Sequence, residues 1–297
     1  MELRVLRYFL TVAQQGNITS AARLLHITQP TLSRQIRDLE EELGHPLFER
    51  NSHSISLTPE GLLLRRRAEE ILDLVQKTEV ELAQPDSVVA GDVYVGAGET
   101  IGAHFLTQAA CILRKKYPDV HFHIFSGDGV DVCERLDKGL LDFGLLFDPV
   151  DQKKYSALRL PHQDVWGVLL RRDSPLAQKD AVSPEDLAGQ PLIVSRQTLK
   201  RPFFLDWFGK NTEELNIVGT YNLIFNGSLM VEDGMGCAFS LAGLVNVSSP
   251  TGLCFRPLEP RVEANIYLVW KKHQVFSRAA EKYLEELRRL IVSLPSE

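Results

Sequence analysis

The fold of this chain is decided by residues 18–40, which read ITSAARLLHITQPTLSRQIRDLE. The spacing of apolar residues predicts two short helices joined by a tight turn. The second helix begins at Thr28, a residue type that caps helix N-termini, and Pro30 falls in the first turn, where its missing N–H does no harm. The first helix is expected to pack inward through Ala21, Ala22, Leu24 and Leu25.

The second helix has two different faces. Its apolar residues recur at intervals of four and three, which predicts an inward face formed by Leu32, Ile36 and Leu39. The opposite face presents hydrogen-bonding side chains at the exposed start of the helix, as a helix that reads base edges in the major groove must do. The spacing alone is equally compatible with an ordinary amphipathic hairpin whose polar face is solvated.

Further motifs follow the hairpin in a fixed order. After residues 21–25 (AARLL) and 28–36 (TQPTLSRQI) come 39–40 (LE), 43–44 (LG), 46–50 (PLFER) and 57–61 (LTPEG). In order, spacing and position at the start of the chain, this series closely resembles the DNA-binding domain of LysR-type transcriptional regulators. The resemblance implies a winged helix-turn-helix that contacts double-stranded DNA through Thr28, Gln29, Pro30, Thr31, Ser33, Arg34, Arg37, Arg50 and His53. Wings of this family commonly carry an arginine at the tip, where this chain has only His53.

Size and composition set the broad class. The 297 residues are 44% hydrophobic and 24% charged, which fits a globular protein of two or three domains. No apolar run approaches the ~20 residues that a membrane-spanning helix needs, and the first residues lack the pattern of a secretory signal. We therefore expect a cytoplasmic protein with no membrane partner.

The four cysteines and the charge distribution add two expectations. Cys111, Cys133, Cys237 and Cys254 are widely spaced, without a CxxC or a metal-binding pattern, so reduced thiols and no metal are expected. Some regulators of the resembling family sense oxidants through a cysteine pair, which remains an alternative. Residues 1–67 carry a net charge of +2 and the remainder −8, so a weakly basic head precedes an acidic body.

A long helix is expected after the head. Residues 3–13 predict a first helix packed through Leu3, Leu6, Phe9, Leu10 and Ala13, and residues 44–57 predict a small β-wing. Thr58 and Pro59 then begin a helix to about residue 83, with coiled-coil spacing at Leu64, Ala68, Ile71, Val75, Thr78 and Leu82. A dimerising helix is favoured, because a palindromic DNA site requires a symmetric protein, although a single long surface helix is the alternative.

From residue 91 onward the sequence alternates strands and helices. Strands at 93–95, 120–125 and 143–147 with helices at 103–117 and 130–138 predict a parallel sheet. A second unit starts at 166–170 and continues with strands at 192–194, 236–240 and 265–270, a strand end at 222–226, and helices at 183–186, 203–208, 228–233 and 276–292.

Two α/β lobes of this kind resemble the effector-binding region of the same family, which is akin to periplasmic binding proteins. The expected fold class is thus α plus α/β. We expect a DNA-binding domain at 1–58, a linker and dimerisation helix with a hinge at 59–90, and an effector-binding domain at 91–297. Within the last, one lobe comprises about 91–161 and 268–297, and the other about 162–267.

In open parallel sheets, ligands bind beyond the carboxyl ends of the strands. This rule selects Thr100, Ile101, Ser126, Gly127, Phe147, Ser195, Arg196, Asn226 and Ser240, with Glu99, Asp128, Asp148 and Gln197 beside them. Thr100 is the favoured contact, because it precedes a helix whose N-terminus suits a carboxylate, but a plain N-cap role is the alternative. Arg196 is expected either to supply a positive charge to the effector or to form an exposed ion pair within the protein. Glu99 and Asp128 argue against a strongly anionic ligand.

The sequence is compatible with three classes of function to different degrees. The leading hypothesis is a sequence-specific transcriptional regulator, a homodimer or homotetramer whose DNA binding is modulated by a small-molecule effector, possibly a carboxylate. A solute-binding protein without a DNA role would fit residues 91–297 alone. An enzyme is disfavoured, because the chain lacks a GxSxG elbow, a Walker loop and an HExxH motif, and the glycine turn at 96–102 does not match GxGxxG. No catalytic residue and no cofactor is expected.

Overall fold

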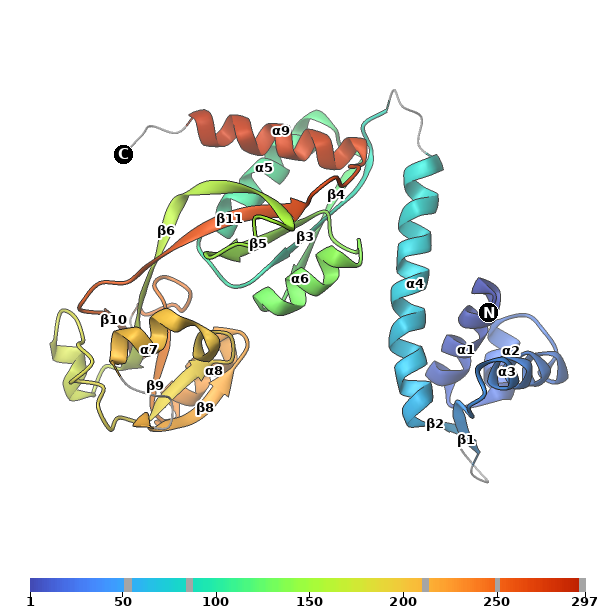
Figure 1. Cartoon of the computed structure of the whole chain (residues 1–297), viewed down its shortest axis with the longest axis horizontal. Helices are drawn as coiled ribbons and strands as arrows, with labels where there is room; N and C mark the ends of the chain where they lie inside the picture. The colour runs from blue at the N-terminus through green and yellow to red at the C-terminus, as the bar shows by residue number, and fades with distance from the viewer. Residues whose placement is uncertain (51–54, 84–87, 210–213, 249–251, 294–297) are drawn as a thin grey trace. The chain divides into compact units, whose positions relative to one another are not determined.

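The computed structural model describes residues 1–50, 55–83, 88–209, 214–248 and 252–293 (Figure 1). The chain divides into two compact units, Met1–Pro85 and Asp86–Glu297, and each is described by itself. The expected fold class is confirmed: a winged helix-turn-helix and a long helix are followed by a two-lobed α/β region. Within the described residues, no helix is both long enough and apolar enough to cross a bilayer.

Three helices form the core of the first unit: α1 (Leu3–Gln15), α2 (Ile18–Leu24) and α3 (Gln29–Leu43). Asn17 caps α2 by accepting a hydrogen bond from the backbone N–H of Ser20 at 3.0 Å. Thr28 caps α3 as expected, and Gly44 ends it in the left-handed conformation that glycine adopts without strain. Each helix therefore begins or ends where its own residues favour it.

The apolar faces predicted for α1 and α2 are partly wrong. Leu3 is exposed, and Val5 and Val12 are buried instead, because the buried face of α1 is centred on Leu6 and Phe9. Leu24 is 60% exposed, because it is the last residue of α2, just before the chain turns away at His26 with a φ of 55°.

The wing and the long helix follow. Strands β1 (Phe48–Arg50) and β2 (Ile55–Leu57) pair antiparallel, as the predicted wing requires, whereas residues 51–54, including His53, lie outside the described residues. Helix α4 (Pro59–Ala83) starts after Thr58, whose hydroxyl donates to the carbonyl of Pro46 at 2.8 Å and accepts from the N–H of Gly61 at 2.9 Å.

The apolar stripe along α4 is used in two ways. Leu64, Ala68 and Ile71 pack into the core formed by α1, α2 and α3. Farther along, Thr78 is exposed and Leu82 is 82% exposed. The predicted coiled-coil stripe is thus covered by its own unit over its first half and uncovered near its end.

The second unit is built on one nine-stranded sheet. Its order is β4-β3-β5-β11-β6-β9-β7-β8, with β10 paired to β6. The strands are β3 (Gly91–Ala97), β4 (Val120–Ser126), β5 (Phe143–Phe147), β6 (Tyr155–Arg171), β7 (Leu192–Ser195), β8 (Ile217–Tyr221), β9 (Cys237–Leu241), β10 (Leu253–Pro257) and β11 (Glu263–Lys271). Strand β3 is parallel to β4 and β5, and β7 is parallel to β8 and β9, so each lobe has its own parallel group.

Strands β6 and β11 run antiparallel to each other and join the two lobes (Figure 1). Lobe 1 contains β3, β4 and β5, with α5 (Ala103–Lys116) and α9 (Arg278–Ser293) on one face and α6 (Gly129–Asp137) on the other. Lobe 2 contains β7, β8, β9 and β10 with α7 (Pro202–Phe208), α8 (Ile224–Glu232) and short 3₁₀ turns η1 (Pro175–Gln178) and η2 (Thr198–Lys200). Tyr283 and Phe143 are fully buried in lobe 1, as are Phe204 and Phe239 in lobe 2.

Three predicted elements are corrected here. The strand expected to start at Trp166 begins at Tyr155. The helix expected at 183–186 is a turn, because Ser183 and Asp186 exchange hydrogen bonds between side chain and backbone that close the turn. Asn226 does not follow a strand end: β8 ends at Tyr221, and Asn226 is an exposed residue of α8.

Candidate functional site

The polar face of α3 is a candidate surface for nucleic acid. Leu32, Ile36 and Leu39 are buried in the core of the first unit, which fixes the rotation of the helix about its axis. As a result, six of the residues predicted to contact DNA are exposed: Thr28, Gln29, Pro30, Thr31, Arg34 and Arg37. Ser33 is half-buried. Arg50 ends β1, and His53 lies outside the described residues.

Hydrogen bonds within this face order its side chains. Gln29 Nε2 donates to Ser33 Oγ at 2.8 Å, and the hydroxyls of Thr28 and Thr31 are 2.8 Å apart. Among the described residues, Arg34 makes only a 3.8 Å ion pair with Asp38, and its side chain is 82% exposed. Arg37 forms no ion pair with any residue that the structure describes. The face therefore offers amides, hydroxyls and two available guanidinium groups.

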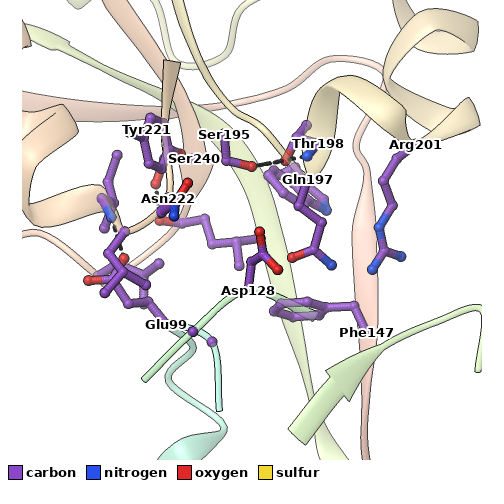
Figure 2. Close-up of a pocket in the computed structure, with 17 residues that line it drawn as sticks. Glu99, Asp128, Phe147, Ser195, Gln197, Thr198, Arg201, Tyr221, Asn222 and Ser240 are labelled. Atoms are coloured by element: carbon purple, nitrogen blue, oxygen red, sulfur yellow. Dashed lines mark hydrogen bonds between the residues drawn. The ribbon is translucent and has the colours of Figure 1, made fainter. Parts of the chain in front are cut away.

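A second candidate site is a cavity between the lobes of the second unit (Figure 2). This interlobe cavity has a volume of about 550 Å³, including space open to solvent. It lies beyond the carboxyl ends of strands from both lobes, as the rule for open sheets predicts. Its apolar wall includes Phe147, Trp166, Leu241 and Leu244, and its polar groups include Glu99, Asp128, Gln197, Arg201 and Asn222.

Three hydrogen bonds cross from one lobe to the other beside this cavity. Glu99 of lobe 1 accepts from the backbone N–H of Ile224, at the first residue of α8. Gln197 of lobe 2 accepts from the N–H of Gly129 at 3.1 Å. Arg201 of lobe 2 donates to the backbone carbonyl of Asp148. These bonds hold the two lobes together, and a molecule bound in the cavity would lie next to them.

The carboxylates near the cavity already hold backbone partners. Asp128 caps α6, accepting from the N–H groups of Val130 and Asp131 at 2.8 and 3.1 Å. Asp148 accepts from both the backbone N–H and the side-chain amide of Asn265, at 3.2 and 2.9 Å. Asp128 therefore has a structural role as a helix cap, and Asp148 has one in holding Asn265 of β11.

Thr100 does not line the cavity. It is 7% exposed, donates its hydroxyl proton to Asp164, and accepts from the N–H of Gly102 at 2.9 Å. Asp164 is 2% exposed and also bonds to His162 Nε2 at 3.1 Å. Burial raises the pKa of the Asp164 carboxyl, and the bonds to Thr100 and His162 oppose part of that shift. The contact of Thr100 with an effector stays a prediction.

The remaining predicted residues fall into two groups. Gly127, Phe147, Ser195 and Ser240 line the interlobe cavity. Outside the lining are Ile101, Ser126, Asn226 and Arg196, the last of which is exposed and borders an outer recess together with Lys200 and Arg201.

Two important lining residues were missed by the sequence reasoning. Asn222 immediately follows the true end of β8, so a correct strand end would have selected it. Arg201 lies between η2 and α7, away from any strand end, and no sequence signal marked it.

The cysteines and possible metal ligands give no further site here. All four cysteines are free thiols, and burial raises the pKa of Cys237 to about 11. In the described part of the chain, no three His, Cys, Asp or Glu side chains gather in a way that could hold a metal ion.

Two protein-family models together match most of the chain. The model described as "Bacterial regulatory helix-turn-helix protein, lysR family" matches residues 3–62. The model described as "LysR substrate binding domain" matches residues 86–291. The first matched range contains the polar face of α3, and the second contains the residues that line the interlobe cavity.

Relatives and a solved structure share this organisation over nearly their whole length. The chain is 28% identical over 292 residues to the HTH-type transcriptional regulator YvbU of Bacillus subtilis, covering 98% of this chain and 99% of the relative. It is 29% identical over 282 residues to the Hca operon transcriptional activator HcaR of Escherichia coli, covering 93% of each. The crystal structure of full-length CbnR complexed with its target DNA has a TM-score of 0.74 at 21% identity, over 97% of this chain and 99% of that one, which shows a shared fold.

Proposed function

Because this chain belongs to the LysR family of DNA-binding transcriptional regulators, we propose that it reads its DNA site with the polar face of α3 and senses a small effector in the interlobe cavity. The observation that carries the proposal is the orientation of α3. Its apolar residues are fixed in the core, so Gln29, Thr31 and Arg34 are presented together at the exposed start of the helix. A helix in this setting can enter the major groove with its first turns against base edges.

The two guanidinium groups are assigned different roles. Arg34 lies in the second turn of α3, near Gln29 and Thr31, and we assign it to base readout. Arg37 lies one turn farther on and has no ion-pair partner among the described residues, which suits a phosphate contact.

We infer that the effector acts by changing how the lobes meet. The bonds from Glu99, Gln197 and Arg201 cross between the lobes at the cavity, so an occupant that replaces or strengthens them changes the lobe angle. A ligand shifts such an equilibrium only by its difference in affinity for the two arrangements. In a homodimer or homotetramer, that change would alter the spacing of the DNA-binding heads.

We further propose that the chain works by binding without transforming its effector, and that it works in the cytoplasm. The location follows from the DNA on which the head would act, and the binding role follows from the family. Incubating purified protein with any effector that it binds, and finding the effector chemically unchanged, is the result that we expect. Turnover of the effector would contradict the binding role.

Gel shifts with the DNA upstream of the protein's own gene test the DNA proposal. We expect a sequence-selective shift by the wild-type protein, and a loss of about 1–3 kcal/mol of discrimination in Arg34→Ala. Arg278→Ala is the matched control, because Arg278 lies in α9 of the second unit and forms an exposed 3.7 Å ion pair with Glu281. Absence of a selective shift, or identical discrimination by wild type and Arg34→Ala, would refute the proposal.

A further inference from the structure

Arg201 is a partly buried cation at the edge of the interlobe cavity. It lies between η2 and α7, lines the cavity, and also borders the outer recess. Burial lowers the pKa of its guanidinium group, and the nearby negative charge of Asp148 opposes only part of that shift. The group has therefore lost hydration that a charged partner would have to replace.

The charge of Arg201 is only partly offset within the described residues, by the nearby carboxylate of Asp148. Among the described residues, its one hydrogen bond goes to the backbone carbonyl of Asp148, and no carboxylate forms an ion pair with it. The side-chain oxygens of Asp148 are both held by Asn265, and Asp128 is held by the first turn of α6. A guanidinium carries five N–H donors in a fork that fits a carboxylate, so most of its donors remain for another group.

We propose that Arg201 anchors the effector, and that the effector is a small organic monoanion with an apolar body. The inference rests on the proposed function of the interlobe cavity and names the ligand class that this cavity selects. A carboxylate or comparable monoanionic group pairs with Arg201, and the rest of the molecule lies against Phe147, Trp166 and Leu241.

The restriction to one negative charge comes from the opposite side of the cavity. Figure 2 shows Glu99 and Arg201 on opposite sides, and Asp128 also faces the space. Glu99 forms no ion pair with any described residue. A second anionic group on the ligand would therefore meet unneutralised carboxylates, which repel it in a partly desolvated site.

The ligand class is tested with the purified full-length protein and defined probes. The probes are benzoate and hexanoate, their neutral amides benzamide and hexanamide, the dianions phthalate and adipate, and the cation benzylammonium, each measured by thermal shift and calorimetric titration. We expect at least one monocarboxylate to bind, and its amide and dianionic counterparts to bind at least about 10-fold more weakly, because a hydrogen bond to a charged group is lost or a repulsion is added. Binding of an amide, dianion or amine as tight as that of the monocarboxylates overturns the proposal, as does failure of both monocarboxylates to bind.

The role of Arg201 is tested with two matched variants. We expect Arg201→Met to weaken monocarboxylate binding at least about 10-fold, and the neighbouring Lys200→Met, which removes an exposed charge of the outer recess only, to change it less than about 2-fold. Arg201→Lys should keep part of the preference for the anion over the amide, with lower affinity, because lysine keeps the charge but not the fork. Equal effects of Arg201→Met and Lys200→Met would overturn the assignment.

The melting temperature of the ligand-free protein distinguishes a ligand-binding role of Arg201 from a purely structural one. Arg201→Met loses the bond to the Asp148 carbonyl but also removes a partly buried charge, and these two effects oppose each other, so we expect the ligand-free variant to melt within about 2 °C of wild type. A melting temperature several degrees lower would show that Arg201 serves the fold, and would overturn the proposal. DNA binding by the wild-type protein is measured in parallel. A wild type that gives a selective gel shift but binds no monocarboxylate refutes this inference alone, whereas a wild type that gives no selective shift refutes the proposed function.

Discussion

Single residues shape the interlobe cavity mainly through the partners that each charged group already holds. Asp128 and Asp148 are engaged by backbone or amide N–H groups, and Glu99 accepts from the start of α8. These bonds satisfy hydrogen-bonding capacity without supplying a positive charge. Arg201 is the reverse case: among the described residues its only hydrogen-bond acceptor is a neutral carbonyl, although the carboxylate of Asp148 lies nearby. The cavity is therefore polarised, with the Arg201 cation, only partly offset by Asp148, on one side and Glu99 on the other.

The strand-end rule found part of this site at the residue level. Gly127 follows β4, Ser195 ends β7 and Ser240 is the next-to-last residue of β9. All three line the cavity near strand ends that the sequence marks clearly, while their contact with an effector stays a prediction. Thr100 was favoured for a ligand because it precedes a helix, but its hydroxyl is held by Asp164, which is 64 positions away in sequence. Long-range pairing of this kind leaves no local signal, so no spacing argument could have revealed it.

Asp164 should make the stability of the second unit depend on pH. Burial raises the pKa of Asp164 in the folded protein above its ordinary value of 3.8, so the folded state holds this proton more tightly than the unfolded state. The stabilising contribution of the proton is then complete below about pH 3.8 and is lost as the pH rises through the folded pKa. Above that pH, the folded protein carries a buried charge that disfavours it.

Substitution of Asp164 isolates this effect. Asp164→Asn keeps an oxygen that can accept from Thr100 but has no charge to bury. We expect the unfolding free energy of the variant, relative to wild type, to increase from pH 4 to pH 7 in denaturant titrations. Thr100→Val is the control for loss of the hydrogen bond alone. A relative free energy that falls over the same range would show that the charged form of Asp164 is the stabilising one.

At the scale of whole elements, helices and strands with a regular sequence pattern were predicted correctly, and those with an interrupted pattern were not. Helix α3 was placed correctly, because a cap at Thr28, a proline in the first turn and a regular buried row all agree. Strand β6 was expected to start too late, since Pro161 interrupts its first half. The structure places that proline opposite the register shift between Asn265 and Tyr267 of β11, where the ladder is irregular and a missing N–H is tolerated.

The wrong assignment around Asn226 has a similar origin. Residues 223–225 are Leu-Ile-Phe, and such a run of apolar residues fits a buried strand as well as one side of a helix. Tertiary packing decides for the helix, because Ile224, Gly227 and Val231 are buried in α8 while Phe225 is exposed. The predicted strand end was displaced by five residues, and Asn222 was lost from the candidate site as a consequence.

The junction between the wing and α4 depends on Gly61. A Cβ at this position would lie 2.1 Å from the backbone oxygen of Leu47, an atom that cannot move without shifting the wing. We expect Gly61→Ala to lower the unfolding free energy of the first unit by about 1–3 kcal/mol, the usual cost of overpacking. Thermal melts of Gly61→Ala and of Leu62→Ala, an exposed neighbour in α4, give the comparison. Equal melting temperatures for both variants and wild type would contradict the close packing described here.

Over the whole molecule, each unit has its own hydrophobic core and its own candidate surface. The first unit combines α1, α2, α3 and half of the α4 stripe in one core, and the second has separate cores in its two lobes. Because capping and periodicity are local, the sequence supports an expectation of separate domains at 1–58, 59–90 and 91–297, and those bounds stay a prediction. It did not predict that the first half of the α4 stripe would be covered by the head, because that depends on how the helices pack in three dimensions.

The uncovered end of the α4 stripe predicts how copies of the chain associate. Leu82 is 82% exposed, and Thr78 is exposed on the same stripe, so this region has apolar surface that its own unit does not cover. If two copies of α4 pair there, Leu82→Glu places two carboxylates in the seam and should weaken the dimer at least about 10-fold, because a lost leucine contact and a buried charge together exceed 1.4 kcal/mol. Sedimentation equilibrium of the full-length protein measures the dissociation constant directly.

Val275→Glu, at a fully exposed apolar residue of the second unit, makes the same chemical change outside the stripe and should leave association unchanged. Dissociation constants for Leu82→Glu and Val275→Glu that both match wild type would show that the stripe is solvated, and the pairing of DNA-binding heads would then have to come from the second unit.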